Sequence, residues 1–316
     1  MQSFVTLTRL LTRGRLAIRV VVASCLALLP CVASALPDDC NPTASPLVFG
    51  AYDTLNPTVG TVAISVTCEN TTGPTRTFNY TLALSSGPGS YASRSMTGTG
   101  DTLGYNLYTA ATYSTVWGDG TGGSVVVAGS ITVPRATILV DTKTVFGRIS
   151  APQNVVPGSY STATPVTVTL SGVRSTSQVS TFNVSTTVAA RCDTSATALA
   201  FGPIALLSSQ TDASSSITVQ CTKNSPYTVG LSAGSTTGAT IAQRLMANGT
   251  NIMLYNLYSN AGRTTIWGDL IGLWVSGTGA GLAVPQTRSV YGRVANGQTS
   301  LAIGNYLETI TVTVAY

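Results

Sequence analysis

The sequence predicts an all-β protein built from two antiparallel sandwiches of Greek-key type in tandem. Three observations support this fold class: an internal repeat, short segments that alternate apolar and polar residues, and clusters of Gly, Pro, Asn and Ser between them. Outside residues 1–35 no long helical periodicity is present. Only 9% of the 316 residues are charged, which agrees with a chain rich in Thr, Ser, Val, Gly and Ala.

The two copies of the repeat contain the same short motifs in the same order. They predict two homologous domains, residues 36–172 and 173–316, with the boundary in the polar stretch 171–177. Segments such as 61–66 and 166–170 alternate at period two, which indicates half-buried strands. The matching motifs are Leu47–Gly50 with Leu199–Gly202, Arg94–Met96 with Arg244–Met246, Tyr105–Tyr108 with Tyr255–Tyr258, Trp117–Asp119 with Trp267–Asp269, Gly147–Arg148 with Gly292–Arg293, and Gly158–Tyr160 with Gly304–Tyr306.

Residues 1–35 are organised as a secretory signal peptide. Four arginines precede an apolar run over 20–32, and the small residues 33–35 follow, so we expect cleavage after Ala35. The run contains Pro30 and is too short for a permanent membrane helix. The alternative is a lipoprotein signal ending at Cys25, but cleavage there would leave too short an apolar core. The sequence therefore predicts an exported protein, without membrane insertion.

The charge balance argues against a nucleic-acid partner. All 11 acidic residues lie beyond residue 35, whereas four of the 16 basic residues precede it, so cleavage would lower the net charge from +5 to +1. A nearly neutral chain with scattered Lys and Arg lacks the basic surface that binds nucleic acid or anionic lipid.

Four cysteines follow the predicted cleavage site, in two pairs of nearly equal spacing. An even count in an exported chain favours disulfides, and pairing within each repeat joins Cys40 to Cys68 and Cys192 to Cys221. Closing loops of this size is worth about 3 kcal/mol each in the chain-entropy model. A zinc site is the alternative, and the wide spacing without CxxC or His disfavours it.

The residue inventory disfavours catalysis. The chain has no His, so the usual general base and the usual nucleophile-activating pairs are missing. Acidic residues are few and mostly single, which leaves no evident pair for glycoside hydrolysis. The Gly-rich tract 118–123 lacks the Lys of a phosphate-binding loop, and we interpret it as a turn. We expect no enzyme activity, metal or cofactor.

Features present in both copies are expected to maintain the fold, and features that differ are expected to carry function. The shared residues assigned to the fold are Trp117, Asp119, Arg148, Trp267, Asp269 and Arg293. The copies differ at 70–76, at the Gly-rich and then Val-rich stretch 120–140, and at the apolar loop 270–274. An exposed apolar loop would mark an interface, although a packing role is the equal alternative.

The segment from Glu308 to Tyr316 is predicted to form a strand with no partner after it in the sequence. An uncovered strand edge favours association with another chain. The candidate residues for a groove that accepts a strand from another chain are Ile310, Val312, Val314 and Tyr316, with an ordinary core as the alternative. Residues 179–188 form a further predicted strand, which either closes the first domain or begins the second.

The combined motif order closely resembles the spore coat protein U domain, twice over, across nearly all of the chain beyond residue 35. The resemblance implies immunoglobulin-like sandwiches of archaic chaperone–usher pilus subunits, incomplete until a periplasmic chaperone or a neighbouring subunit supplies a strand. Stalk subunits of this family carry one such domain and the tip adhesin carries two. The resemblance therefore implies an adhesin with a chaperone, an usher and a neighbouring pilin as partners.

The short segment before Cys40 agrees with a terminal position in a fibre. Residues 36–39 contain two acids and a proline, and they are too few to form a donor strand. We expect a pilus tip subunit on the cell surface, whose first domain binds an abiotic or host surface and supports biofilm formation. The alternative is a secreted spore-coat or matrix protein that self-associates without chaperone and usher.

Overall fold

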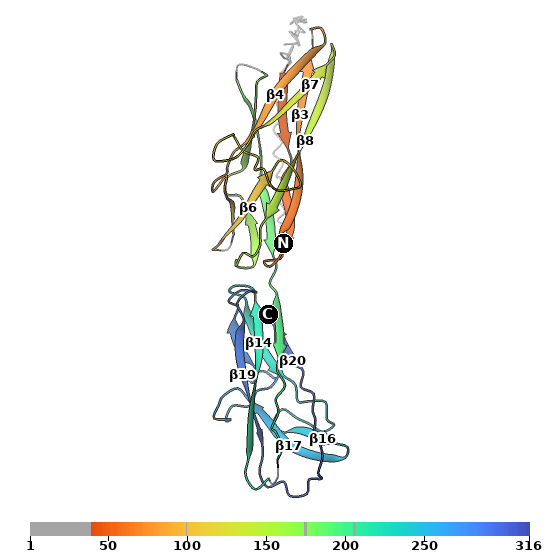
Figure 1. Ribbon diagram of the computed structural model, residues 1–316, viewed down its shortest axis with the longest axis vertical. Helices are drawn as coiled ribbons and strands as arrows, with labels where there is room; N and C mark the ends of the chain where they lie inside the picture. Colours follow the sequence, from red (N-terminus) through yellow and green to blue (C-terminus); the bar gives the residue numbers. More distant parts are fainter. Residues whose placement is uncertain (1–38, 72, 99, 174–175, 205–206) are drawn as a thin grey trace, which may run out of the picture. The chain divides into compact units, whose positions relative to one another are not determined.

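The computed structural model describes residues 39–316, apart from 72, 99, 174–175 and 205–206. The predicted signal peptide, residues 1–35, lies outside the described residues. All regular elements of the described chain are β-strands, which confirms the all-β fold class (Figure 1). No helix that could span a membrane occurs in the described part of the chain.

The first sandwich contains an eight-stranded sheet in the order β1-β3-β8-β6-β5-β9-β12-β2 and a four-stranded sheet in the order β11-β10-β4-β7. All pairings are antiparallel except that of β12 with β2, which is parallel. Its strands are β1 Asp39–Ala44, β2 Leu47–Tyr52, β3 Thr58–Asn70, β4 Arg76–Leu84, β5 Arg94–Thr97, β6 Thr102–Tyr108, β7 Val127–Val133, β8 Thr137–Ile149, β9 Gly158–Ser161, β10 Val166–Ser171, β11 Gln178–Phe182 and β12 Val184–Val188.

The second sandwich contains a five-stranded sheet in the order β13-β14-β19-β17-β16 and a three-stranded sheet in the order β18-β15-β20. Its described strands are all antiparallel. They are β13 Cys192–Ala196, β14 Thr211–Cys221, β15 Pro226–Leu231, β16 Arg244–Asn248, β17 Asn251–Tyr258, β18 Val275–Thr278, β19 Gln286–Val294 and β20 Val312–Ala315.

The alternating pattern of the sequence places apolar side chains between the sheets of each sandwich. In β3, the side chains of Val62, Ile64 and Val66 are buried, and the residues between them are exposed or half-buried. Successive side chains of a strand point to opposite faces, so one face of the strand lines the core and the other meets solvent. Two separate apolar clusters result, one in each sandwich.

Residues 178–188 belong to the first sandwich. β11 pairs with β10 of the first repeat, and β12 pairs with β2 and β9. Inward-facing positions alternate through both strands, with Phe182, Val184 and Val188 buried. This segment therefore closes the first domain, which answers the question that the sequence left open. The boundary expected at 172/173 precedes both strands, and we propose instead that the division lies after Val188.

Two disulfides join Cys40 to Cys68 and Cys192 to Cys221, the pairing that the sequence favoured. In each case the two cysteines lie directly opposite each other on neighbouring antiparallel strands.

Each sandwich also buries one arginine, which sequence analysis did not single out. Arg94 and Arg244 donate to main-chain carbonyls and to the side-chain amide oxygen of an asparagine, and no carboxylate pairs with either in the described residues. Their Nη2 atoms donate to the carbonyls of Trp117 and Trp267, at 2.8 and 2.7 Å. Burial lowers the pKa of both guanidinium groups. The Arg-x-Met motif in both copies is the signal from which this pair could have been predicted.

Candidate functional site

The strand β20 of the second sandwich corresponds to β10 of the first. The two tryptophans fix this correspondence, because Trp117 Nε1 donates to the carbonyl of Leu82 and Trp267 Nε1 to that of Val229. Leu82 lies opposite Leu170 of β10, and Val229 lies opposite Val314 of β20. The same register matches Val168 with Val312 and Val166 with Ile310.

Burial differs sharply between these equivalent strands. Val166 and Val168 are fully buried and Leu170 is 1% exposed, whereas Ile310, Val312 and Val314 are only partly buried. The reason is the next strand in the sheet. β11 covers the outer edge of β10, and no described strand lies at the corresponding edge of β20.

The Leu-x-Phe-Gly motif shows the same contrast. Leu47 and Phe49 lie in β2, which is a strand because it pairs in parallel with β12. The matching residues Leu199 and Phe201 lie in a stretch, 199–204, that forms no strand, and both side chains are partly buried. The motif is the same in both copies, so the missing neighbour explains the difference in structure.

A third segment repeats the pattern. β9 pairs along its length with β12, and Tyr160 is fully buried. The matching segment 304–307 has one isolated bridge, between Ala247 and Leu307, and Tyr306 is only partly buried. Three segments of the second sandwich thus surround one unfilled strand position.

We call the partly buried apolar residues around this position the open strip. They pack against the core of the second sandwich without being enclosed by it. Its residues are Cys192, Leu199, Phe201, Ile204, Leu207, Leu301, Tyr306, Ile310, Val312 and Val314.

The groove residues predicted from the sequence fall partly within this strip. Ile310, Val312 and Val314 belong to it, whereas Tyr316 is 61% exposed and is not packed against the core. The remaining members of the strip lie in the first half of the repeat and near residue 301. Sequence reasoning missed them because they occupy the same motifs as buried residues of the first domain, such as Leu47 and Tyr160. Their sequence pattern is therefore that of ordinary core residues.

Glu308 fixes the chain beside the open strip. Its carboxylate accepts hydrogen bonds from the backbone N–H groups of Ser235, Thr236 and Thr309 and from the Ser235 hydroxyl. Desolvation acts to raise the pKa of this carboxyl, but the hydrogen bonds outweigh it and lower the pKa to about 2. Glu308 therefore stays ionised and clamps the turn at 235–236 to the segment that leads into β20.

Among the residues assigned to the fold, the two tryptophans are buried as predicted. The acid and the arginine of each repeat have separate partners. Asp119 accepts hydrogen bonds from Thr121 within its own turn, and the Arg148 guanidinium lies over the Tyr113 ring. Arg293 pairs with Asp212 through two hydrogen bonds, and Asp269 is exposed.

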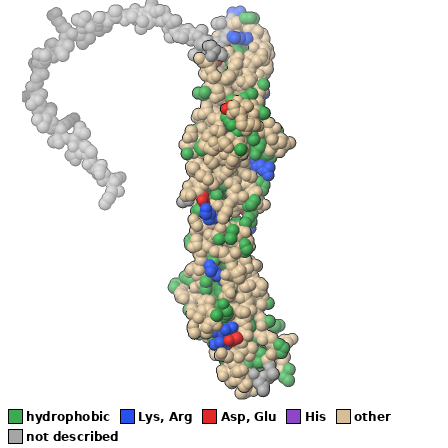
Figure 2. Space-filling model, turned by 60° about the vertical axis from the view of Figure 1, so that its left-hand side comes forward, with side chains coloured by type: hydrophobic (Ala, Val, Ile, Leu, Met, Phe, Trp, Pro, Cys, Tyr) green, Lys and Arg blue, Asp and Glu red, His purple; other side chains and the backbone are tan. Residues whose placement is uncertain are grey.

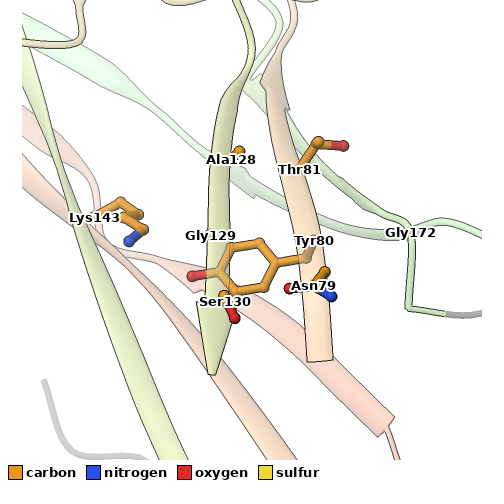
Figure 3. A pocket seen from close by; sticks show the side chains of 8 residues that line it. All are labelled: Asn79, Tyr80, Thr81, Ala128, Gly129, Ser130, Lys143 and Gly172. Atoms are coloured by element: carbon orange, nitrogen blue, oxygen red, sulfur yellow. The ribbon is translucent and has the colours of Figure 1, made fainter. Parts of the chain in front are cut away.

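A hollow of about 780 Å³ in the first sandwich has polar residues that satisfy one another (Figure 3). The Tyr80 ring lies against Gly129, and Lys143 extends toward it from β8. The Tyr80 hydroxyl donates to Asp141, and the Lys143 ammonium lies 3.1 Å from the same carboxylate. Desolvation acts to raise the pKa of Asp141, but Tyr80 and Lys143 outweigh it and lower that pKa.

The described residues contain no group of three or more His, Cys, Asp or Glu that could hold a metal ion. Charged side chains are also sparse on the face shown in Figure 2. The most distinctive feature is therefore the contrast between a closed and an open sandwich.

Two disulfide-bridged β-sandwiches in tandem, one of them open at a strand position, define the class of the protein. The chain belongs to the Spore Coat Protein U domain family, whose profile matches residues 27–169 and 178–313. Protein U of Myxococcus xanthus is 33% identical over 107 residues, which cover 32% of this chain and 58% of Protein U. The match thus spans a little over half of that relative.

Two solved structures are similar to this chain at low sequence identity. One is the CsuC–CsuE chaperone–tip adhesion subunit pre-assembly complex of Acinetobacter baumannii Csu pili, with a TM-score of 0.54, 17% identity and coverage of 88% of this chain and 100% of the matched chain. The CupB6 tip adhesin of Pseudomonas aeruginosa matches with a TM-score of 0.39 and 10% identity over 88% of this chain and 94% of its own. At this identity the first likeness shows a common fold.

Proposed function

We propose that this protein is a non-enzymatic tip subunit of a chaperone–usher pilus, and that its second sandwich accepts a β-strand from another chain. The observation that carries the proposal is the open strip, where apolar side chains remain half-buried around an unfilled strand position. Burying the strip under an extended segment would remove apolar surface from water and pair the free edge of β20.

The first sandwich indicates what kind of segment fits the open strip. Its own segment 178–188 places Phe182, Val184 and Val188 inward and keeps Thr181 and Thr187 outward. A partner strand should therefore alternate apolar and polar residues over about ten positions. Because the fold is shared with a tip subunit that was crystallised with its chaperone, we propose a periplasmic chaperone as the first partner and a neighbouring pilin as the second.

The end of the first sandwich that contains the β3–β4 and β7–β8 connections is our candidate for surface attachment. There β7 and β8 have 7 and 13 residues, against 4 and 9 in the corresponding β18 and β19. Asn70 is buried and donates to the carbonyls of Pro74 and Val133, which ties the β3–β4 loop to β7. These contacts hold the part of the first sandwich that the second sandwich lacks in a fixed conformation. A fixed loop region of this kind is suited to binding a surface.

Attachment is tested by charge substitution at that end. Ile138 is 57% exposed in β8, so Ile138→Asp should leave stability within about 0.5 kcal/mol of the unmodified chain. Adsorption of purified protein to polystyrene and to glass should fall. The control is Val59→Asp at the opposite end of β3, where the side chain is 52% exposed. Equal losses in both variants would contradict a binding role for this end.

Strand acceptance is tested with a peptide of residues 178–188, labelled with a fluorophore and titrated with the full chain. We expect saturable binding by fluorescence anisotropy. A control peptide with Ser at positions 182, 184 and 188 should not bind, and one with Ser at the outward positions 181 and 187 should bind like the original. Failure of the original peptide to bind would overturn the proposal. It would favour the alternative of a self-associating coat or matrix protein if the chain then assembled by itself.

A further inference from the structure

The two disulfides lie in nearly identical local settings. Each joins residues that face each other on antiparallel strands, with Cα atoms 4.0 Å apart, and the sequence separations are 28 and 29 residues. Any difference in their chemistry must therefore come from what surrounds them.

The first disulfide is enclosed. Cys40 and Cys68 are both fully buried, and Pro42 on the same face of β1 is buried too. That face is covered because β1 lies against β11, the strand that closes the first sandwich.

The second disulfide is open on one side. Cys221 is fully buried, but Cys192 is partly exposed, and Thr194 and Ala196 on the same face of β13 are exposed. No described strand of the second sandwich holds the position of β11, and Cys192 is itself a member of the open strip.

The charged residues that flank the two disulfides also favour thiolate attack on the second one over the first. Asp39 and Glu69 adjoin the first disulfide and face each other across the strands, which disfavours the approach of an anionic thiolate, although Asp39 also has an interaction partner of its own. Arg191 directly precedes Cys192, and Lys223 lies two residues after Cys221. Both cations have carboxylate partners, Asp193 and Asp101. We therefore expect the accessibility of the second disulfide to depend mainly on the missing strand and only slightly on charge.

We propose that the Cys192–Cys221 disulfide is a thiol–disulfide exchange site for dithiol reductants, accessible while the open strip is empty and closed once a strand lies on it. The second half of this statement rests on the proposed function. A subunit without its strand would thus keep a disulfide that oxidoreductases can edit, and an assembled one would not.

The direction of the reaction follows from the burial of the two residues, because Cys192 is partly exposed and Cys221 is fully buried. A thiolate of the dithiol attacks Cys192 Sγ, the disulfide breaks, and Cys221 Sγ leaves as a thiolate that takes up a proton. The second thiol of the reagent then attacks the mixed disulfide and releases Cys192 as a thiol. The reagent departs as a disulfide, and its two electrons and two protons remain on the protein.

The test uses the full chain under native conditions. Dithiothreitol is added, samples are alkylated with iodoacetamide at intervals, and each cysteine is quantified by mass spectrometry. We expect Cys192 and Cys221 to be alkylated at least about tenfold faster than Cys40 and Cys68, because exchange follows access. A saturating amount of the 178–188 peptide should slow the second pair to the rate of the first, and the peptide with Ser at 182, 184 and 188 should not.

The outcomes separate this inference from the proposed function, because peptide binding is measured in parallel by anisotropy. Equal rates for the two disulfides would overturn the exchange site. A peptide that binds but leaves the rate unchanged would overturn its closure by a strand, while strand acceptance stands. Selective reduction without peptide binding would support the exchange site and overturn the proposed function.

Discussion

The two sandwiches share one plan, but only the first supplies its own closing strand. Val168 in β10 and Val312 in β20 occupy the same register position, yet the first is fully buried and the second is half-exposed. The same comparison separates Leu47 from Leu199 and Tyr160 from Tyr306. The difference teaches that these side chains are core residues whose burial depends on a neighbouring strand, so the open sandwich carries the same core positions on these segments without enclosing them.

The largest effect should come from opening the first sandwich. Val184 is fully buried in β12, so Val184→Asp would place a charge in the core and should cost more than about 4 kcal/mol, enough to unfold this domain. Thermal unfolding followed by circular dichroism checks this. The control is Thr187→Asp, because Thr187 is exposed on the same strand. Similar unfolding of both variants would contradict the role assigned to the inward face of 178–188.

The buried arginines allow the two sandwiches to be destabilised one at a time. Arg94→Met and Arg244→Met each remove donors from several buried carbonyls and should cost about 3 kcal/mol. We expect each substitution to shift the unfolding of its own sandwich only. Calorimetry of both variants checks this, and a substitution that shifted both transitions equally would show that the sandwiches unfold as one unit.

Adding the missing strand should stabilise only the second sandwich. A ligand present at 100 times its dissociation constant stabilises the state that binds it by about 2.7 kcal/mol. In calorimetry, the 178–188 peptide should therefore raise the transition that Arg244→Met lowers. It should leave the transition affected by Arg94→Met unchanged. A rise in the first transition alone would mean that the peptide acts at the closed sandwich.

The smallest effect concerns pH and Glu308. Its pKa is about 2 in the folded protein, below the ordinary value of 4.5, so its contribution is complete above about pH 4.5 and is lost as pH falls through 2. We expect about 1 kcal/mol for this partly exposed group once solvent screening is included. Glu308→Gln should remove that part of the pH dependence from the second transition. An unchanged profile in the variant would show that the carboxylate does not stabilise the turn at 235–236.

The repeat made the fold and both disulfides predictable, because matching motifs such as Trp117–Asp119 and Trp267–Asp269 require two similar domains. The period-two pattern likewise put Ile310, Val312 and Val314 on one face of a predicted strand, and all three side chains are partly buried. The rest of the open strip was not predictable, because Leu199 and Leu47 have the same local sequence and differ only in a neighbour distant along the chain. The division that we propose after Val188 differs from the boundary predicted at 172/173 for a related reason, since a polar stretch marks a loop but does not show which sheet the next strand joins.

Hydrogen exchange of the full chain, with and without the 178–188 peptide, tests the central claim most directly. If the second sandwich accepts a strand, amides in 199–204, 304–307 and 310–316 should become protected on peptide binding, and amides of β2, β9 and β10 should not change. Unchanged exchange in all three segments at saturating peptide, or equal protection of both sandwiches, would contradict the account.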